Sequence, residues 1–233
     1  MIRKHIPNAI TCLNLFSGCV AIVYGYEGSY LTAALFIALA AVFDFLDGMA
    51  ARVLKAYSPM GKELDSLADL ISFGVAPGIM AYSYLFTQSI ISDNPTFLAW
   101  AGFLIPVFSA LRLAKFNLDD RQATSFLGLP TPANGLFWAF CFASSFELFL
   151  DVDFNPILIV LGILVSCGLL VSEIPMFSLK FKHLKIKGNR LRYLYLLGSL
   201  ILVVFLRENA IAPSILWYIL LSVLNIGFVK KTE

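Results

Sequence analysis

The stretch that decides the fold is residues 43–69, FDFLDGMAARVLKAYSPMGKELDSLAD, which joins two strongly apolar segments. Its acidic residues at the ends of those segments are Asp44, Asp47, Asp65 and Asp69. A carboxylate at the border of a membrane-like segment costs several kcal/mol unless it is paired or bound to a cation. The stretch therefore predicts two apolar helices whose ends share a charged partner.

The composition outside this stretch points to a membrane protein. Hydrophobic residues make up 59% of the 233 positions and charged residues 14%, and the mean hydropathy is +0.83. Soluble domains are about 45–50% apolar and about 25% charged. The formal net charge of +2 is too small to suggest a nucleic-acid partner. We expect an all-α, polytopic bundle of membrane helices.

Apolar segments long enough to cross a bilayer recur along the whole chain. A crossing needs roughly 20 apolar residues. The candidates lie at about 8–26, 30–51, 66–89, 95–115, 132–150, 156–174, 191–207 and 212–229. We expect about eight transmembrane helices in a single domain, residues 1–233, with its C-terminal spans at about 156–229. In the third span, Gly74, Pro77 and Gly78 predict a kink.

The distribution of basic residues predicts the orientation of these spans. Lys and Arg are enriched in cytoplasmic loops. With both termini in the cytoplasm, every one of the 17 basic residues except Arg207 falls on the inner side. An odd number of spans would scramble this pattern. The residue 43–69 stretch then lies at the cytoplasmic face.

Helix geometry predicts that the four aspartates lie close together. Asp44, Asp47, Gly48 and Ala51 fall within a sector of about 100° on one helix. Asp65 and Asp69, four residues apart, share a face of the next helix. Because the connection is short, the two helix ends should face each other and bring the four carboxylates together. Hard divalent cations such as Mg²⁺, Mn²⁺ or Ca²⁺ prefer such oxygen ligands.

The residues beside the aspartates allow two interpretations. Gly48 and Ala51 could let helices pack closely, or they could leave room for a flat ligand beside the metal. Arg52 offers a planar cation suited to phosphate. Metals, a cation and space for a ligand fit phosphoryl transfer, in which two divalent ions can hold the attacking and leaving oxygens.

The spacing of these residues resembles a known signature. Asp44-x-x-Asp47-Gly48-x-x-Ala51-Arg52, eight further residues, and Gly61-x-x-x-Asp65-x-x-x-Asp69 match the CDP-alcohol phosphatidyltransferases. The resemblance implies a dinuclear metal site, with Mg²⁺ or Mn²⁺ on Asp44, Asp47, Asp65 and Asp69. It implies that Asp69 is the general base. It also implies a CDP pocket formed by Asn8, Thr11, Gly48, Ala51, Arg52 and Gly61.

Further stretches resemble the phosphatidylserine synthases within this family. They are IPNAITCLNLFSGCVAI at the start, MGKELDSLADLISFGVAPG, ALRLAKFN at 110–117 and FLGLPTPANG at 126–135. The chain departs from the expected pattern at Lys115, where Arg is common, and at Asn134, where Ala is common. Arg112, Lys115 and Asn117 would bind the serine carboxylate or the lipid phosphate. Positive-inside anchoring is the alternative for the two cations.

The resemblance implies transfer of the phosphatidyl group of CDP-diacylglycerol to L-serine, giving phosphatidylserine and CMP. It also implies a homodimer in the cell membrane, in contact with membrane lipids and with its active site facing the cytoplasm. One alternative keeps the chemistry and changes the acceptor to inositol phosphate, glycerol phosphate or another alcohol. A divalent-cation transporter is the alternative from another class, because intramembrane carboxylates can line ion paths. Such a path needs acidic residues near mid-membrane, and all four aspartates lie at the inner ends of spans.

Overall fold

The computed structural model describes residues 5–119, 126–143, 155–177 and 189–229, and these residues are almost entirely helical. The α-helices are α1 (Ile6–Tyr26), α2 (Tyr30–Val53), α3 (Pro59–Asp69), α4 (Ala76–Ile91), α5 (Leu104–Leu118), α6 (Thr131–Ala143), α7 (Pro156–Val171), α8 (Arg190–Leu206) and α9 (Ile211–Val229). A π-helix, η2 (Leu70–Val75), joins α3 to α4, and two 3₁₀ segments, η3 (Thr96–Phe103) and η6 (Arg207–Ala210), precede α5 and α9. The expected all-α class is confirmed.

Four continuous helical segments are long and apolar enough to cross a membrane. They are Ile6–Tyr26, Tyr30–Val53, Pro59–Ile91 and Thr96–Leu118, of 21, 24, 33 and 23 residues. Shorter apolar helices follow at Pro156–Val171 and Ile211–Leu224. The chain is thus an integral membrane protein with several apolar helices. The end of the predicted fifth span, 144–150, lies outside the described residues.

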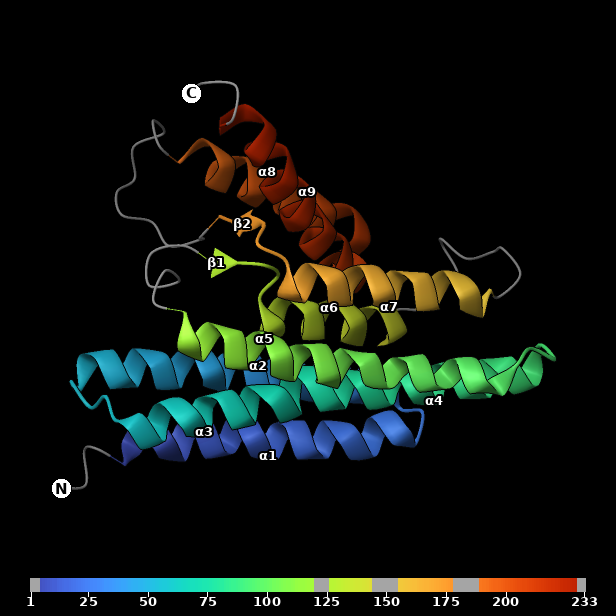
Figure 1. Cartoon of the computed structure of the whole chain (residues 1–233), viewed down its shortest axis with the longest axis horizontal. Helices are drawn as coiled ribbons and strands as arrows, with labels where there is room; N and C mark the ends of the chain where they lie inside the picture. Colours follow the sequence, from blue (N-terminus) through green and yellow to red (C-terminus); the bar gives the residue numbers. More distant parts are fainter. Residues whose placement is uncertain (1–4, 120–125, 144–154, 178–188, 230–233) are drawn as a thin grey trace.

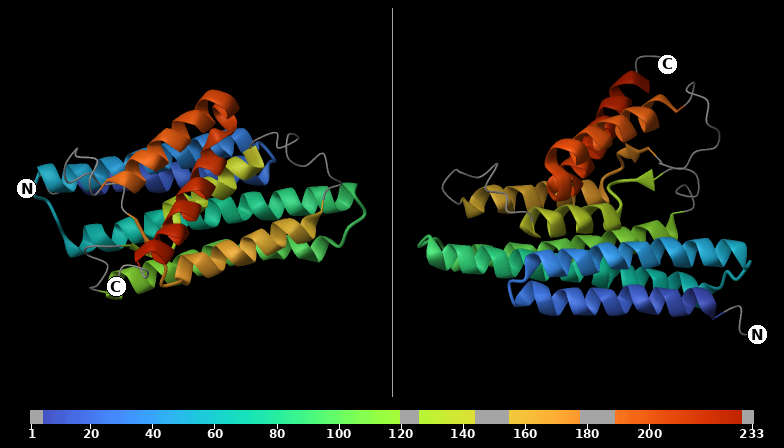
Figure 2. Two further views of the ribbon diagram at one scale, coloured as in Figure 1. Left: turned by 90° about the horizontal axis from the view of Figure 1, so that it is seen from above. Right: turned by 180° about the vertical axis from the view of Figure 1, so that it is seen from behind.

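The first seven helices run nearly side by side, and the last two do not (Figure 1). Both additional views show α8 and α9 crossing the other helices at a steep angle (Figure 2). The chain turns back between α1 and α2 and again between α2 and α3, so α1 begins where α2 ends and α3 begins (Figure 1). We call this the carboxylate end, defined by residues 44–69. We call the other the aromatic end, defined by the turn at Glu27–Ser29 between α1 and α2.

The predicted kink in the third span takes the form of the π-helix η2. Pro77 has no N–H to donate to the carbonyl of Phe73, so an ordinary α-helical bond is missing there. The segment Leu70–Val75 is wound as a π-helix and α4 begins at Ala76. Such π segments are frequent at functional sites. The irregular turn therefore follows directly after Asp69, the last aspartate of the signature.

Glycines bring neighbouring helices into close contact around η2. A Cβ at Gly18 would lie 2.8 Å from the Cα of Ser72, and a Cβ at Gly135 would lie 2.7 Å from the Cα of Phe73. Real side chains do not tolerate such distances to backbone atoms. The absence of a side chain at these two glycines thus lets α1 and α6 pack closely on η2.

A short antiparallel pair of strands links the segment before α6 to the segment after α7. Strand β1 (Phe126–Leu127) pairs antiparallel with β2 (Pro175–Met176). Gly128, with a φ of +75°, follows β1 and donates its N–H to the carbonyl of Ile174 at 2.9 Å. A Cβ there would lie 2.6 Å from the carbonyl oxygen of Leu170. This turn sets the start of α6 beside the end of α7.

Candidate metal and nucleotide site

The connection between α2 and α3 sets the carboxylates face to face. Helix α2 ends at Val53, and Lys55 adopts a φ of +50°, a left-handed conformation typical of the residue that terminates a helix. Ser58 caps α3, since its Oγ accepts a hydrogen bond from the N–H of Gly61 at 3.0 Å. Pro59 then occupies the first turn, where it leaves no N–H unpaired. The chain reverses within five residues, as the sequence predicted.

Three of the four aspartates meet at the end of these helices. Carboxylate oxygens of Asp44, Asp47 and Asp65 all lie within 4.8 Å of one another. Asp47 is buried, and Asp44 and Asp65 are partly buried. Oδ1 of Asp65 is buried without a hydrogen-bond partner among the described residues. Three negative groups at this separation repel one another and have lost hydration, so a cation between them would stabilise the site.

The donor set fits a hard divalent metal. All the converging atoms are carboxylate oxygens, which Mg²⁺ and Mn²⁺ prefer over softer ligands. The unpaired oxygen of Asp65 is a free ligand position. Asp44, Asp47 and Asp65 could therefore hold a metal ion.

Asp69 is buried and lies outside this group of three. Its Oδ1 accepts a hydrogen bond from Nδ2 of Asn14 at 3.4 Å. It is within electrostatic range of Asp44, Asp65 and Arg112. The prediction that four carboxylates converge is thus met by three of them as a compact group, with Asp69 one helical turn beyond Asp65.

Helix α1 supplies polar partners to the carboxylates from α2 and α3. The hydroxyl of Thr11 lies 2.6 Å from Oδ2 of Asp47 and 3.0 Å from the carbonyl of Pro7. Since a hydroxyl has one proton, the shorter contact to the charged oxygen is the stronger one. Thr11 and Asn14 lie three residues apart, so they share a face of α1. Asn14 was not predicted as a site residue, although an amide within an apolar span is itself a functional signal.

A cavity of about 220 Å³ opens beside the aspartates. Its lining residues are Pro7, Asn8, Thr11, Asp47, Gly48, Ala51, Ala56, Tyr57, Ser58, Gly61, Lys62 and Asp65. Five of the six residues predicted to bind nucleotide are in this set. A Cβ at Gly61 would lie 3.1 Å from Oδ1 of Asn8, so a side chain there would narrow the cavity. Tyr57, Ser58 and Lys62 were not predicted.

Arg52, the sixth predicted nucleotide-binding residue, is not among the lining residues. Its side chain is exposed, and its Nε donates a hydrogen bond to the carbonyl of Gly48 at 2.9 Å. The bond anchors the base of the guanidinium on the last turn of α2. The residue therefore stands at the edge of the cavity.

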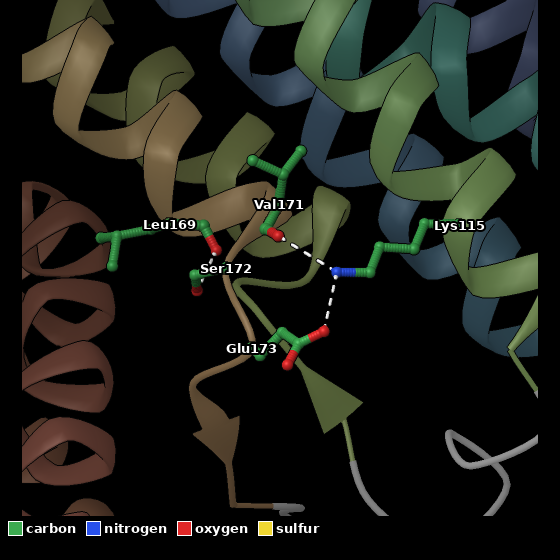
Figure 3. Close-up of polar contacts among 5 residues, drawn as sticks. All are labelled: Lys115, Leu169, Val171, Ser172 and Glu173. Carbon is green, nitrogen blue, oxygen red and sulfur yellow. Dashed lines mark hydrogen bonds and ion pairs between the residues drawn. The ribbon is translucent and has the colours of Figure 1, made fainter.

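The three residues predicted to bind serine or lipid phosphate are separated by the structure. Arg112 is buried near Asp69. Lys115 instead points toward the end of α7, where its Nζ lies 3.3 Å from the carbonyl of Val171 and 3.6 Å from Oε1 of Glu173 (Figure 3). Nδ2 of Asn117 donates to Oγ of Ser66 at 2.9 Å, which ties α5 to α3.

The chain is similar to a known protein family and to individual bacterial and archaeal proteins. Residues 4–171 match the family model described as CDP-alcohol phosphatidyltransferase. A CDP-diacylglycerol–serine O-phosphatidyltransferase from Bacillus subtilis is 38% identical over 183 residues, which are 78% of this chain and 92% of that protein. One from Helicobacter pylori is 31% identical over 201 residues, 84% and 80% of the two chains. An archaetidylserine synthase from Methanothermobacter thermautotrophicus is 37% identical over 129 residues, 54% of this chain and 53% of its own.

Proposed function

The chain belongs to the CDP-alcohol phosphatidyltransferase family, and on that premise we propose that it transfers the phosphatidyl group of CDP-diacylglycerol to L-serine, releasing CMP. The observation that carries the proposal is the group of three carboxylates, Asp44, Asp47 and Asp65, beside a cavity lined by residues of the family signature. The names of the similar proteins support serine as the acceptor, since serine appears in all three.

The carboxylates hold divalent metal in this proposal. Asp44, Asp47 and Asp65 would be ligands of Mg²⁺ or Mn²⁺, and with Asp69 the site would hold two ions. When bound, such ions neutralise the charge that develops on the departing CMP. Thr11 keeps the Asp47 carboxylate oriented through the 2.6 Å hydrogen bond.

The cavity receives the CDP group. Gly48 and Ala51 present little side chain toward it, and Gly61 keeps its wall open beside Asn8. The exposed guanidinium of Arg52 stands where it can pair with a phosphate. These residues bind and orient the nucleotide, and the lipid tails of the donor remain in the bilayer.

Asp69 acts as the general base. The serine hydroxyl oxygen bonds to the lipid-side phosphorus, the bond from that phosphorus to the CMP oxygen breaks, and Asp69 accepts the hydroxyl proton. The carboxylate of Asp69 is buried, and Asn14 orients it. Asp69 is effective through its position, because a base that is held within reach of the serine hydroxyl proton raises the rate.

The membrane arrangement is the third part of the proposal. The whole chain acts as one catalytic domain with eight crossings in the cell membrane, its termini and active site facing the cytoplasm, and it forms a homodimer. Support for the orientation comes from Lys62, Arg112 and Lys115, which all lie at the carboxylate end. Labelling of single cysteines from each side of the membrane tests the crossings, and crosslinking tests the dimer.

The acceptor is tested with purified protein, CDP-diacylglycerol and a panel of alcohols. We expect CMP release with L-serine and Mg²⁺ or Mn²⁺, and none after chelation of the metal. CMP release only with inositol phosphate, glycerol phosphate or another alcohol would contradict the serine assignment. Metal-independent release would contradict the role of the carboxylates.

The assignment of the base is tested by Asp69→Asn. The amide is close in size to the carboxylate and retains an oxygen for the bond from Asn14. We therefore expect a folded protein whose CMP release with serine is abolished. A release rate close to that of the unaltered protein would refute the assignment.

A further inference from the structure

Helix α8 has no buried face within the described part of the chain. None of its 17 residues is buried, and it packs mainly on α9 and on η6. Both α8 and α9 cross the rest of the bundle at a steep angle (Figure 2). Most of the large apolar side chains of α8 are exposed, with Val204 at 66% and Phe205 at 79%. The stability of this helix therefore depends on what covers it in the membrane.

An apolar groove of about 820 Å³ lies between α8 and α9. The indole N–H of Trp217, the polar side-chain group of its lining, donates a hydrogen bond to the carbonyl of Leu194 at 3.3 Å. A Cβ at Gly198 would lie 2.8 Å from Cε2 of Trp217, so the glycine lets the two helices meet there. The wall of the groove is therefore hydrocarbon, and its lining includes Leu194, Leu197, Gly198, Ile201, Leu216 and Trp217.

A second cavity, of about 290 Å³, lies at the start of α8. Its described lining is Phe177 together with residues 189–192, which include Arg190 and Arg192. Asn189 is 2% exposed, and its Oδ1 accepts a hydrogen bond from Nη1 of Arg192. Arg190 is exposed. We call this the arginine cavity.

The arginine cavity and the apolar groove adjoin along α8. Arg190, Leu194, Leu197 and Ile201 follow the spacing i, i+4, i+7 and i+11, which places them on one side of a helix. Arg190 lines the cavity and Leu194 lines the groove. These two positions are about 6 Å apart along the helix axis. One molecule with an anionic head and a hydrocarbon body would fit both spaces.

The place of α8 in the fold agrees with such a ligand. The helix begins on the side of the molecule where the carboxylate end lies (Figures 1 and 2). In the orientation proposed above, that side faces the cytoplasm, and the cytoplasmic leaflet has a negative surface potential that attracts basic side chains. No acidic residue belongs to the described lining of the arginine cavity. The charge of this cavity thus complements that of an anionic lipid head.

We propose that α8 and α9 bind one anionic phospholipid, with its phosphate at Arg190 and Arg192 and its acyl chains in the apolar groove. Guanidinium groups suit a phosphate because they can donate two parallel hydrogen bonds to it. The hydrogen bond from Arg192 to the buried Asn189 holds that guanidinium at the cavity. The acyl chains cover the side of α8 that includes Leu194, Leu197 and Ile201.

This lipid is a structural ligand and not a substrate. The cavity beside the carboxylates is lined by residues between 7 and 65, whereas the lipid site is formed by α8, α9 and Phe177. A ligand that binds only the folded protein stabilises it. The bound lipid therefore stabilises the pair of helices α8 and α9. The inference goes beyond the proposed function and takes from it only the orientation in the membrane.

The experiment uses Trp217 as a probe of the groove. Purified full-length protein is reconstituted in phosphatidylcholine vesicles that contain a brominated-chain lipid, either phosphatidylglycerol or phosphatidylcholine, since bromine quenches tryptophan fluorescence on contact. The signal of Trp217 is the part that Trp217→Phe removes. Phosphatidylglycerol is neither substrate nor product of the proposed reaction. We expect half-maximal quenching of Trp217 at a mole fraction of phosphatidylglycerol at least about tenfold lower than that of phosphatidylcholine, the value of one hydrogen bond to a charged group.

The arginines are tested by Arg190→Gln and Arg192→Gln. Each variant should lose most of the preference for phosphatidylglycerol. Arg207→Gln is the matched control, because Arg207 is an exposed arginine at the other end of α8, and it should retain the preference. In a second readout, phosphatidylglycerol added in detergent should raise the unfolding temperature of the unaltered protein, and Arg190→Gln should lose this shift.

Three results would overturn the inference. Equal quenching by the two lipids would show ordinary contact with the bilayer. No quenching of Trp217 by either lipid would show that protein, such as a second copy of the chain, fills the groove. An unchanged preference in both Arg190→Gln and Arg192→Gln would refute the phosphate site. None of these readouts requires turnover, so a failure to release CMP with serine would refute the proposed function alone.

Discussion

The two ends of the helix bundle use polar groups in opposite ways. At the aromatic end, Tyr30 and Tyr84 pack with ring centroids 5.7 Å apart, and the hydroxyl of Tyr30 lies 3.4 Å from Oγ of Ser83, which donates to the carbonyl of Tyr26. At the carboxylate end, three acidic groups converge and one of their oxygens has no partner among the described residues. The hydroxyls of Tyr30 and Ser83 at the aromatic end are thus paired within the protein, whereas the three carboxylates form a group that could hold a cation.

This difference indicates which end of the bundle depends on a bound ligand for its stability. Interface aromatic residues with satisfied hydroxyls anchor and stabilise helices. Converging carboxylates destabilise them until a ligand arrives, and a ligand that binds the folded state then adds stability. Substitutions at the two ends should therefore separate activity from stability.

The largest expected effect is that of Asp65→Asn on activity. Loss of one charged ligand should lower CMP release at least about 100-fold, more than removal of a group that merely orients a ligand. Without metal the variant should be no less stable, because repulsion among the carboxylates is reduced. Glu63→Gln, the same change at an exposed position of α3, is the control and should leave the rate nearly unchanged. If Asp65→Asn remained active, the carboxylate end would not need this ligand, and the contrast between the two ends would be wrong.

Gly135→Ala should have the next largest effect, and on stability. The added Cβ would meet backbone atoms of Phe73 at 2.7 Å, which cannot move aside as a flexible side chain can. We expect a loss of about 2 kcal/mol, in the range of overpacked cores. Thermal unfolding in detergent measures it. Gly168→Ala is the matched control, since a Cβ there has no atom within 4 Å; equal losses in the two variants would contradict the close contact.

Thr11→Val should weaken the metal site without abolishing it. The valine preserves the shape and removes the 2.6 Å hydrogen bond to Asp47. The Mn²⁺ concentration for half-maximal CMP release should rise about tenfold, as for other groups that orient a ligand. Thr32→Val, near the start of α2 at the aromatic end, should have no such effect. An unchanged Mn²⁺ requirement for Thr11→Val would show that Asp47 is held by other means.

Tyr30→Phe should have the smallest effect, confined to stability. It removes only the 3.4 Å contact with Ser83 and leaves the ring packing intact. A loss below about 1 kcal/mol is expected, with an unchanged serine KM. A marked loss of activity would show that the aromatic end also takes part in catalysis and would end the distinction between the two regions.

Local sequence patterns predicted much of the fold and of the site. Apolar runs marked every long helix, and Ser58-Pro59 marked the start of α3, because these signals act within a few residues. The three-residue step from Asp44 to Asp47 set both on one helix face. Helical spacing alone could not separate Asp69 from the other three aspartates, since that separation depends on how α2 and α3 are placed relative to each other.

By itself, the sequence determined that this chain is a helical membrane protein with a signature for metal-dependent phosphatidyl transfer. Hydropathy and fixed spacing along single helices carry that information. Only the tertiary structure decided that Lys115 pairs with Glu173 across 58 positions and that Asn134 is buried with no hydrogen-bond partner among the described residues. The physical reason is that hydrogen-bond satisfaction and burial depend on the helices that surround a residue, and those neighbours come from distant parts of the chain.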